Sequence, residues 1–354
     1  AAAATALACG VKTYNAAIGM QGTTPEQAVR AENILEVAEK AGKSTGVVTS
    51  VEFSHATPAG FVAHNARRDA YQAIAEEMVN ASAADVIMGC GHPHYDNDGR
   101  QLEKPKYQFI GEATWGMITA GTAGAAVDAD RNGKPDDAWT VLQDRVAFQA
   151  LATAANPPKR VLGIPQVLTT LQQARAGAKK DDLPYAVPPT ERVPTLAEMT
   201  AGALNVLGRN PRGFVVMIEG GAIDWAGHAN QSGRLIEEMV AFNRAVETAV
   251  SWVAQHGSWR ETLLIVTADH ETGYLTGPQA DPANPAWSMV TNAGQGTLPG
   301  MAWNSGGHTN SLVPFFAMGQ GSAALQARAV RRDPVRGLFL DNTDLFHVLR
   351  PALR

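Results

Sequence analysis

Carboxylate and imidazole side chains follow an apolar run in the middle of the chain. Residues 214–218 (Phe-Val-Val-Met-Ile) predict a buried central strand, and Glu219 comes at its end. Two glycines then permit a sharp turn, and Asp224 and His228 follow at a spacing that puts both on one face of a helix. This pattern beyond the carboxyl end of a strand favours a divalent metal site. The alternative is a polar loop whose aspartate caps the next helix and whose histidine lies on the surface.

Two later segments carry the same kinds of ligand. Residues 262–267 predict another buried strand, which leads directly into Asp269 and His270. An adjacent Asp and His can reach one ion if the backbone leaves strand geometry between them. His308 stands in a glycine-containing loop before the apolar run 312–318. Chance rarely produces three such segments in one chain, so the sequence favours a shared metal centre.

Five segments, taken in order, resemble the alkaline phosphatase family. They are residues 10–15, 55–59, 219–228, 267–270 and 307–309. Single motifs among them would also fit related metal-dependent mutases and phosphodiesterases. The resemblance implies an α/β fold over residues 1–354, a three-layer sandwich whose large, mostly parallel central sheet is flanked by helices. Within this single domain, residues 271–305 would form a loop insert over the active site.

The resemblance also implies a centre of two zinc ions and one magnesium ion. Two close divalent ions can clamp the attacking and leaving oxygens of a phosphoryl transfer. The implied ligands are Asp224, His228 and His308 for the first zinc, Asp269 and His270 for the second, and Glu219 and Thr57 for magnesium.

Three further residues would face the substrate. By register from Thr57, Arg68 matches the catalytic, phosphate-clamping arginine of the family, whose planar fork fits two phosphate oxygens. Both Arg68 and its neighbour Arg67 are expected in the helix that follows Thr57, with Arg67 on a solvated face. His55 and Thr57, two residues apart, are expected in extended chain with their side chains on the same side. His55 stands where many members have Asp, and we expect it to reach magnesium through water, because magnesium prefers oxygen ligands. Trp225 is expected to line the pocket.

The resemblance places the family's nucleophilic serine, in an Asp-Ser pair, immediately before Ala1. A strand that supplies a metal-bridging aspartate would lie further upstream. We therefore expect residues 1–354 to lack the nucleophile and the first strand of the sheet, and to be inactive alone. The family also implies a periplasmic or extracellular protein and a homodimer as the expected assembly.

A separate acidic segment follows the calcium-loop rule. Oxygen-bearing side chains occupy its first, third, fifth and ninth positions, with glycine at the sixth. The twelfth position is Trp139, where an acidic residue is usual, and Asp137 is a candidate substitute. The alternative is an acidic turn without metal. The predicted calcium ligands are Asp128, Asp130, Asn132 and Asp136.

Composition excludes some classes of protein. The 29 basic and 34 acidic residues give a net charge of −5 with no basic stripe, which argues against nucleic acid as a specific partner. The absence of a run of eighteen apolar residues argues against a membrane span. Cys9 and Cys90, the two cysteines, are expected as small buried thiols rather than a disulfide.

Local patterns predict three features away from the metal ligands. A Thr-Pro start predicts a helix from about residue 25 to Gly42, and residues 173–194 predict an exposed connection. His92 and His94, two residues apart, are expected in a surface loop rather than at a metal.

The sequence as a whole predicts hydrolysis of phosphate monoesters at alkaline pH through a phosphoserine. One alternative is a phosphodiesterase or sulfatase relative, which the Thr57, Arg68 and Glu219 set for a third metal disfavours. The other is a non-catalytic remnant that binds metal and phosphate.

Overall fold

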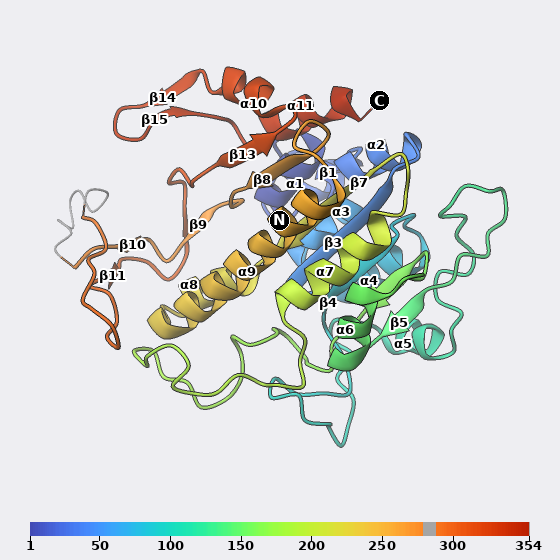
Figure 1. The fold of residues 1–354 in the computed structure, drawn as a ribbon, viewed down its shortest axis with the longest axis horizontal. Helices are drawn as coiled ribbons and strands as arrows, with labels where there is room; N and C mark the ends of the chain where they lie inside the picture. The colour runs from blue at the N-terminus through green and yellow to red at the C-terminus, as the bar shows by residue number, and fades with distance from the viewer. Residues whose placement is uncertain (279–287, 354) are drawn as a thin grey trace.

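A five-stranded parallel sheet lies at the centre of the computed structural model, which describes residues 1–278 and 288–353 (Figure 1). The strand order is β5-β6-β4-β3-β7, and every pair is parallel. The central strands β3 and β4 are buried along almost their whole length, as expected for a parallel sheet covered on both faces. Their bounds are β3 Ser44–Glu52, β4 Val86–Cys90, β5 Thr140–Leu142, β6 Val161–Gly163 and β7 Phe214–Glu219.

Two hydrophobic clusters cover the two faces of this sheet. Along β3, Val47 packs into one cluster and Val48 into the other, because successive side chains of a strand point to opposite faces. The first face is covered by α1 Ala2–Cys9, α2 Ile34–Lys40, α3 Ala56–Val62, α4 Tyr71–Asn80, α5 Glu112–Thr119 and α11 Asp344–Ala352. The second is covered by α6 Arg145–Thr153, α7 Leu196–Leu207 and α9 Ser232–His256. The predicted α/β sandwich with helices on both faces is confirmed.

The strand that leads to Glu219 lies at the edge of this sheet. We predicted a buried central strand, but β7 pairs only with β3 among the described residues, and all six of its residues are half-buried. The predicted strand over 262–267 is β8 (Leu263–Val266), which pairs with β13 (Phe316–Gly319) in a separate antiparallel ribbon. Each of these strands therefore has a second edge without a partner in the described ranges.

Short strand pairs and two further helices complete the fold. They are β1 Met20–Gln21 with β2 Val29–Arg30, β9 Glu271–Thr272 with β12 His308–Thr309, β10 Leu275–Thr276 with β11 Ala302–Trp303, and β14 Arg331–Asp333 with β15 Gly337–Phe339, together with α8 Ala222–His228 and α10 Ser322–Arg328. The expected loop insert over 271–305 thus carries short strands at both ends, and its residues 279–287 lie outside the described residues.

The helix predicted from residue 25 to Gly42 is wrong in its first half. Pro25–Gln27 forms one 3₁₀ turn, and α2 begins only after Asn33. A reciprocal capping box explains this start: the Asn33 side chain accepts from the Glu36 backbone N–H at 2.9 Å, and Glu36 accepts from the Asn33 N–H at 3.0 Å. This cap competes with the Thr-Pro signal eight residues earlier and determines where the helix begins.

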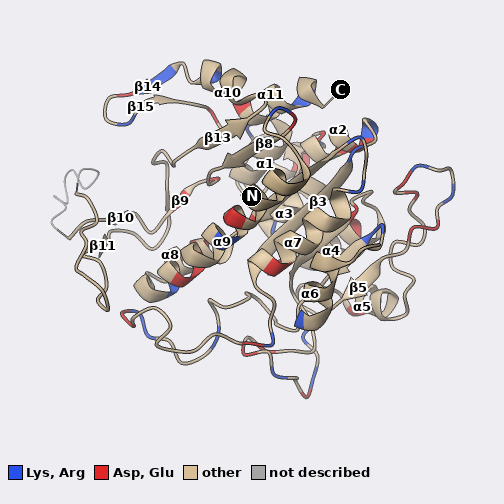
Figure 2. Cartoon of the chain, in the orientation of Figure 1, with Lys and Arg blue, Asp and Glu red and all other residues tan. Residues whose placement is uncertain are grey.

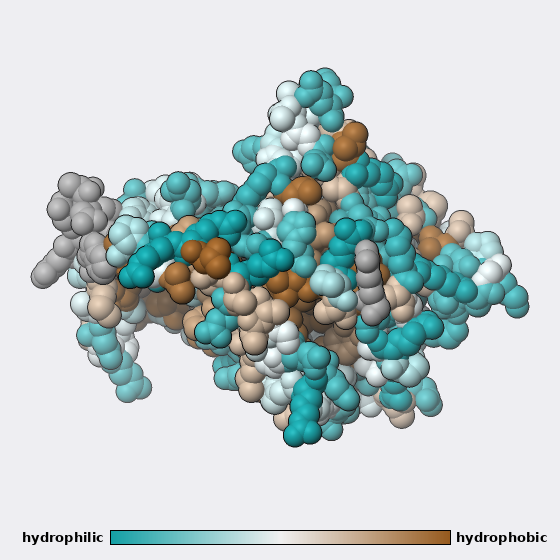
Figure 3. Space-filling model, turned by 90° about the horizontal axis from the view of Figure 1, so that it is seen from above, coloured by the Kyte–Doolittle hydropathy of each residue, from teal (hydrophilic) through white to brown (hydrophobic). Residues whose placement is uncertain are grey.

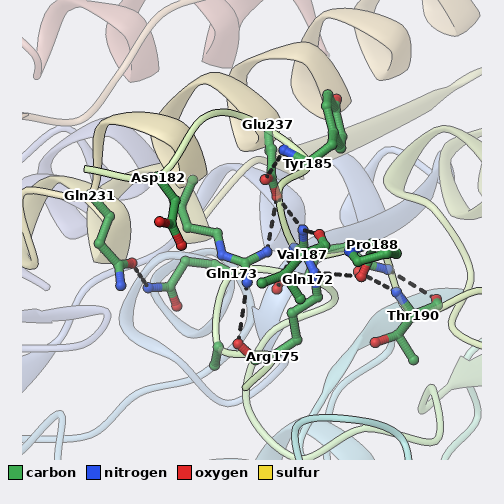
Figure 4. A network of polar contacts seen from close by, with 12 residues as sticks. Gln172, Gln173, Arg175, Asp182, Tyr185, Val187, Pro188, Thr190, Gln231 and Glu237 are labelled. Atoms are coloured by element: carbon green, nitrogen blue, oxygen red, sulfur yellow. Dashed lines mark hydrogen bonds and ion pairs between the residues drawn. The ribbon is translucent and has the colours of Figure 1, made fainter. Parts of the chain in front are cut away.

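The connection over residues 173–194 is tied to α9 by buried ion pairs (Figure 4). Glu237 lies 2.7 Å from Arg175 and 3.0 Å from Arg234, and all three side chains are buried. Arg175 also donates to the carbonyls of Val187 and Pro188 at 2.6 and 3.0 Å. The expectation of an exposed loop is therefore wrong for Arg175 but holds for most of the connection, and the network fixes the first turns of α9, which follows α8.

Two smaller expectations have different outcomes. Cys9 and Cys90 are free, buried thiols, as predicted. His92 is not a surface residue, because it is only 2% exposed and its Nε2 lies 2.9 Å from Gln143 Oε1. An edge-on contact with Tyr95 and a tilted contact with Trp115 give its ring a packing role.

The surface is mixed in charge and partly apolar. Basic and acidic residues are scattered over loops and helix ends, while most of the central sheet is uncharged (Figure 2). Seen from above, apolar patches lie among hydrophilic residues (Figure 3), and exposed Phe316 and Met318 of β13 are among the apolar side chains at the surface. None of the helices in the described ranges is both long and apolar enough to cross a bilayer.

Candidate metal centre

Strand β7 and helix α8 deliver the first three ligand candidates. Glu219 is the last residue of β7, and Asp224 and His228 lie four residues apart on α8, as the spacing predicts. The turn between them needs glycine at residue 221. A Cβ on Gly221 would lie 2.8 Å from Val51 Cγ2 and 2.9 Å from the Glu219 carboxylate. A side chain here would push directly on a ligand candidate.

The β9–β12 pair brings His308 to this helix. His308 stands opposite Thr272 in the strand register. The Thr272 hydroxyl donates to Asp224 Oδ1 at 2.5 Å, which joins the strand pair to α8. Sequence reasoning missed Thr272. The signal was available, because residues two apart in a strand face the same side and Thr272 lies two residues after His270.

Three ligand atoms form a compact triangle at this junction. His308 Nε2 lies 3.2 Å from Asp224 Oδ1 and 3.0 Å from His228 Nε2, and His228 Nε2 lies 3.5 Å from Asp224 Oδ1. A tetrahedral zinc with bonds of about 2.0–2.1 Å separates its ligands by roughly 3.3 Å. The spacing and chemistry of this donor set therefore fit a zinc ion.

The outer hydrogen bond of His228 supports this assignment. Its Nδ1 lies 2.8 Å from the carbonyl oxygen of Gly306, so Nδ1 carries the proton and donates. In its neutral form, His228 presents a bare lone pair at Nε2, which lies 3.0 Å from His308 Nε2. Metal-bound histidines are commonly oriented by such a hydrogen bond to a backbone carbonyl.

A second set of ligand candidates lies beside the first. His270 Nε2 lies 3.4 Å from Asp269 Oδ2, and the His270 ring stacks on His308 at 3.7 Å between centroids. Because the Thr272 hydroxyl proton goes to Asp224, Thr272 accepts from His270 Nδ1 at 3.3 Å. In the neutral form of the ring, His270 Nε2 presents a lone pair beside the Asp269 carboxylate, and a cation between them would stabilise this arrangement.

Ligand atoms of Asp224, His270 and His308 also lie within 4.8 Å of one another. This grouping shares two members with the triangle formed with His228. The His228 distances of 3.0 and 3.5 Å lie near the roughly 3.3 Å of a tetrahedral site, so His228 fits as a third donor for the first ion. His270 also lies beside Asp269.

Glu219 and two threonines form a third group of polar side chains. Its carboxylate accepts from the Thr49 hydroxyl at 2.5 Å and is also hydrogen-bonded by Thr57. Burial raises the pKa of Glu219 to about 7, and the nearby Asp269 and Asp224 carboxylates add to the rise. These oxygen donors suit magnesium, which prefers carboxylate, hydroxyl and water ligands.

His55 and Arg68 meet at the edge of the ligand cluster. Arg68 Nη2 lies 3.0 Å from His55 Nε2, and the His55 ring lies 5.9 Å from Trp225 and 6.5 Å from Tyr71. Arg67, in contrast, forms an exposed pair with Asp69 at 3.1 Å. The two arginines therefore differ: Arg67 is exposed and paired with Asp69, whereas Arg68 contacts His55.

Two local details near these residues differ from expectation. Arg68 lies in a turn before α4, not in a helix, because α4 begins only at Tyr71. His55 is the N-cap residue of α3, so Thr57 lies in the first helical turn rather than in extended chain. Thr57 still reaches Glu219, because the helix begins directly at the end of β3.

Ala1 lies near the same cluster, because Arg68, Asp269, Glu219 and Asp224 all act electrostatically on its nitrogen. Ala1 thus lies within electrostatic range of the carboxylates that follow both β7 and β8.

The acidic loop is assembled differently from its predicted pattern. Asp128, Asp130 and Asp137 come together, and Asp136 is not part of that group. Asn132 turns back to accept from the Lys134 N–H at 2.9 Å, and Lys159 pairs with Asp130 at 3.1 Å. The predicted ligand Asp136 is therefore replaced by its neighbour, and calcium binding at this loop stays a prediction.

Comparisons with known proteins identify the family. The sequence model of the family described as alkaline phosphatase matches residues 1–301. Alkaline phosphatase of Escherichia coli K12 is 30% identical over 387 residues, which covers 100% of this chain and 73% of the relative. Alkaline phosphatase 3 of Bacillus subtilis is 32% identical over 282 residues, which covers 77% of this chain and 49% of the relative. The chain thus spans about half the length of that relative.

Solved structures show the same similarity. A cold-active alkaline phosphatase from Shewanella sp. superposes with a TM-score of 0.67 at 27% identity, covering 100% of this chain and 85% of that chain. A mutant alkaline phosphatase of the Antarctic bacterium TAB5, with His replaced by Asp and magnesium bound in its M3 site, gives 0.62 at 26% identity, covering 100% and 83%. From the family match, the Escherichia coli relative and the shared fold, we conclude that this chain belongs to the alkaline phosphatase family.

Proposed function

We propose that this protein hydrolyses phosphate monoesters at alkaline pH with the help of two zinc ions and one magnesium ion. The observation that carries the proposal is the triangle of Asp224 Oδ1, His228 Nε2 and His308 Nε2, with sides of 3.5, 3.2 and 3.0 Å. Asp269 and His270 would hold the second zinc, and Glu219 and Thr57 the magnesium. When bound, these ions would activate the nucleophile and stabilise charge on the leaving group.

The residues of the chain supply the positioning. Arg68 would bind two phosphate oxygens through its guanidinium, and Trp225 would form a wall beside it. Thr272 and the Gly306 carbonyl fix the tautomers of His270 and His228, so that both rings present lone pairs inward. The nucleophile would be a serine in an Asp-Ser segment placed before Ala1. Residues 1–354 alone would then form no phosphoserine.

The proposal also includes the substrate class, the location of the protein and its assembly. Family resemblance supports phosphate monoesters as substrates, export to the periplasm or the extracellular space, and assembly as a homodimer. The competing assignment is a phosphodiesterase or sulfatase. Turnover of aryl monoesters, aryl diesters and aryl sulfates by the zinc-loaded protein carrying an Asp-Ser segment decides between them. Faster turnover of the diester or the sulfate ester would overturn the monoesterase proposal.

Replacing Arg68 should weaken phosphate binding and turnover together. An ammonium group cannot reproduce the two parallel hydrogen bonds of a guanidinium, so Arg68→Lys should raise the inhibition constant of inorganic phosphate by about tenfold or more. Arg67→Lys is the matched control, because Arg67 is exposed and paired with Asp69. Inhibition constants for both variants provide the measurement, and equal losses would contradict the assignment of Arg68.

Replacing His55 should change the response to magnesium. The ring already uses Nε2 to accept from Arg68, and imidazole is a poor partner for magnesium. A carboxylate adds an oxygen acceptor, as in the TAB5 mutant with magnesium in its M3 site. His55→Asp should therefore bind magnesium more tightly and need added magnesium for full activity. An unchanged magnesium titration would show that His55 does not border the third site.

A further inference from the structure

Two buried groups beside Arg68 lack a hydrogen-bond partner among the described residues. Glu52, the last residue of β3, is fully buried, and neither of its carboxylate oxygens is bonded. His55, three residues later, is 9% exposed, and its Nδ1 is also unbonded. Buried polar groups in native proteins nearly always have hydrogen-bond partners, so two unpaired groups within one turn require an explanation.

The protonation pattern of His55 follows from its other nitrogen. A guanidinium is always protonated and can only donate, so His55 Nε2 must accept from Arg68 Nη2 at 3.0 Å. A neutral imidazole that accepts at Nε2 carries its proton at Nδ1. The unbonded Nδ1 is therefore a buried donor, and the unbonded Glu52 carboxyl group is a buried acceptor.

The local backbone and the surrounding rings restrict both groups. The His55 N–H donates to the Glu52 carbonyl at 2.9 Å, so the two residues form one tight turn. Tyr71 and Trp225 flank the His55 ring, at 6.5 and 5.9 Å between centroids. Burial raises the pKa of Glu52 while the Arg68 charge lowers it, which places Glu52 and Arg68 within electrostatic range of each other.

We propose that Glu52 accepts the Nδ1 proton of His55 through one bridging water, and so orients His55 to hold Arg68. Glu52 is then a positioning residue that acts on the phosphate clamp through an imidazole. A carboxyl group offers an acceptor oxygen in either protonation state, so this role does not depend on its charge. Both ring nitrogens of His55 are then used, which leaves no lone pair for a metal-bound water. The assignment of phosphate as the ligand of Arg68 rests on the proposed function.

Two substitutions at one position separate hydrogen bonding from charge. Glu52→Gln keeps a carbonyl acceptor, whereas Glu52→Leu removes it at similar size. In the zinc- and magnesium-loaded protein, calorimetry with inorganic phosphate should show affinity within about twofold of the parent for Glu52→Gln and about tenfold weaker for Glu52→Leu. Glu238→Leu is the matched control, because Glu238 of α9 is also buried and has an unbonded oxygen, Oε1, but neighbours Glu237 and Arg175 instead.

Two readouts exclude a purely structural effect. Thermal unfolding of Glu52→Leu should occur at a temperature close to that of Glu238→Leu, because each variant replaces one buried carboxyl group by an apolar group. Nitrogen NMR of the metal-free protein should show His55 protonated at Nδ1, with a slowly exchanging proton in the parent and in Glu52→Gln but not in Glu52→Leu. This measurement needs neither metal nor activity.

The outcomes are distinguishable from failure of the proposed function. A proton on Nε2 of His55, or unchanged phosphate affinity in Glu52→Leu while Arg68→Lys loses it, would overturn the inference and leave the function standing. If the parent binds no phosphate, the proposed function fails, and the NMR result alone decides whether Glu52 holds His55.

Discussion

The His308→Ala variant is expected to lose one zinc ion per chain while keeping its fold. His308 Nε2 is 3.0 Å from His228 Nε2 and 3.2 Å from Asp224 Oδ1, so its removal leaves the first site with two protein ligands. A catalytic zinc normally keeps three. Losing a hydrogen-bond partner of a ligand costs about 10–100-fold in metal affinity, and losing the ligand itself should cost more. The side chain is 39% exposed, so its truncation creates no large cavity.

Elemental analysis after dialysis against a weak chelator measures this effect. With the Asp-Ser segment and the upstream aspartate in place, the parent should retain about two zinc ions, and His308→Ala about one. His256→Ala is the matched control, because His256 is an exposed histidine at the end of α9. Zinc content that stays unchanged in His308→Ala, or falls equally in the control, would contradict the ligand assignment.

Adding a segment that ends in Asp-Ser before Ala1 is expected to change activity from background to enzymatic turnover. Typical enzymes turn over on the order of 10 substrate molecules per second, whereas residues 1–354 alone should show none. Asp269 and His270 supply only two protein ligands for the second zinc, and a serine oxygen and an aspartate would complete it. The Ala1 amino group already lies within electrostatic range of Asp269 and Glu219.

The free strand edges support the same experiment. Glu219 ends β7 and Asp269 follows β8, and in the described ranges each of these strands is paired on one side only. A strand that leads into Ala1 could therefore pair there and cover apolar residues that are half-buried. The assay is hydrolysis of an aryl phosphate at high pH, with an Asp-Ala segment as the control. Turnover by residues 1–354 alone that is abolished by His308→Ala would show that another group is the nucleophile.

The convergence of the site could be predicted from the sequence for a simple reason. Glu219 and Asp269 directly follow apolar runs, and ligands of α/β proteins gather beyond the carboxyl ends of strands. The spacing of Asp224 and His228 is a local helical relation, so it needs no knowledge of the rest of the fold. The contrast between Arg67 and Arg68 came instead from the family register counted from Thr57.

Features that depend on distant partners could not be predicted in this way. Apolar content suggested that residues 214–218 form a central strand, but which strand pairs with which is a long-range property, and β7 lies at the edge. Arg175 is charged and stands in a polar connection, so nothing local indicates burial. Its partner Glu237 is sixty-two positions further along the chain.

Other errors arose between neighbouring residues. Asp136 and Asp137 are adjacent, and the backbone conformation of the loop decides which of them joins Asp128 and Asp130. The His55–Thr57 pair was predicted in extended chain, but a helix begins at Ala56 and still brings the threonine to Glu219. In both cases the residue types indicated the chemistry correctly, but the local backbone conformation could not be predicted from them.

Anomalous X-ray diffraction at the zinc absorption edge, from crystals of the zinc-loaded protein carrying the Asp-Ser segment, tests the central claim most directly. The account predicts one peak about 2 Å from Asp224 Oδ1, His228 Nε2 and His308 Nε2, and a second beside Asp269 and His270. Both peaks should fall to the background level when the crystals are grown with a chelator. Zinc bound only at the Asp128 loop, or no peak among these five residues, would contradict the proposed metal centre and the phosphatase function that depends on it.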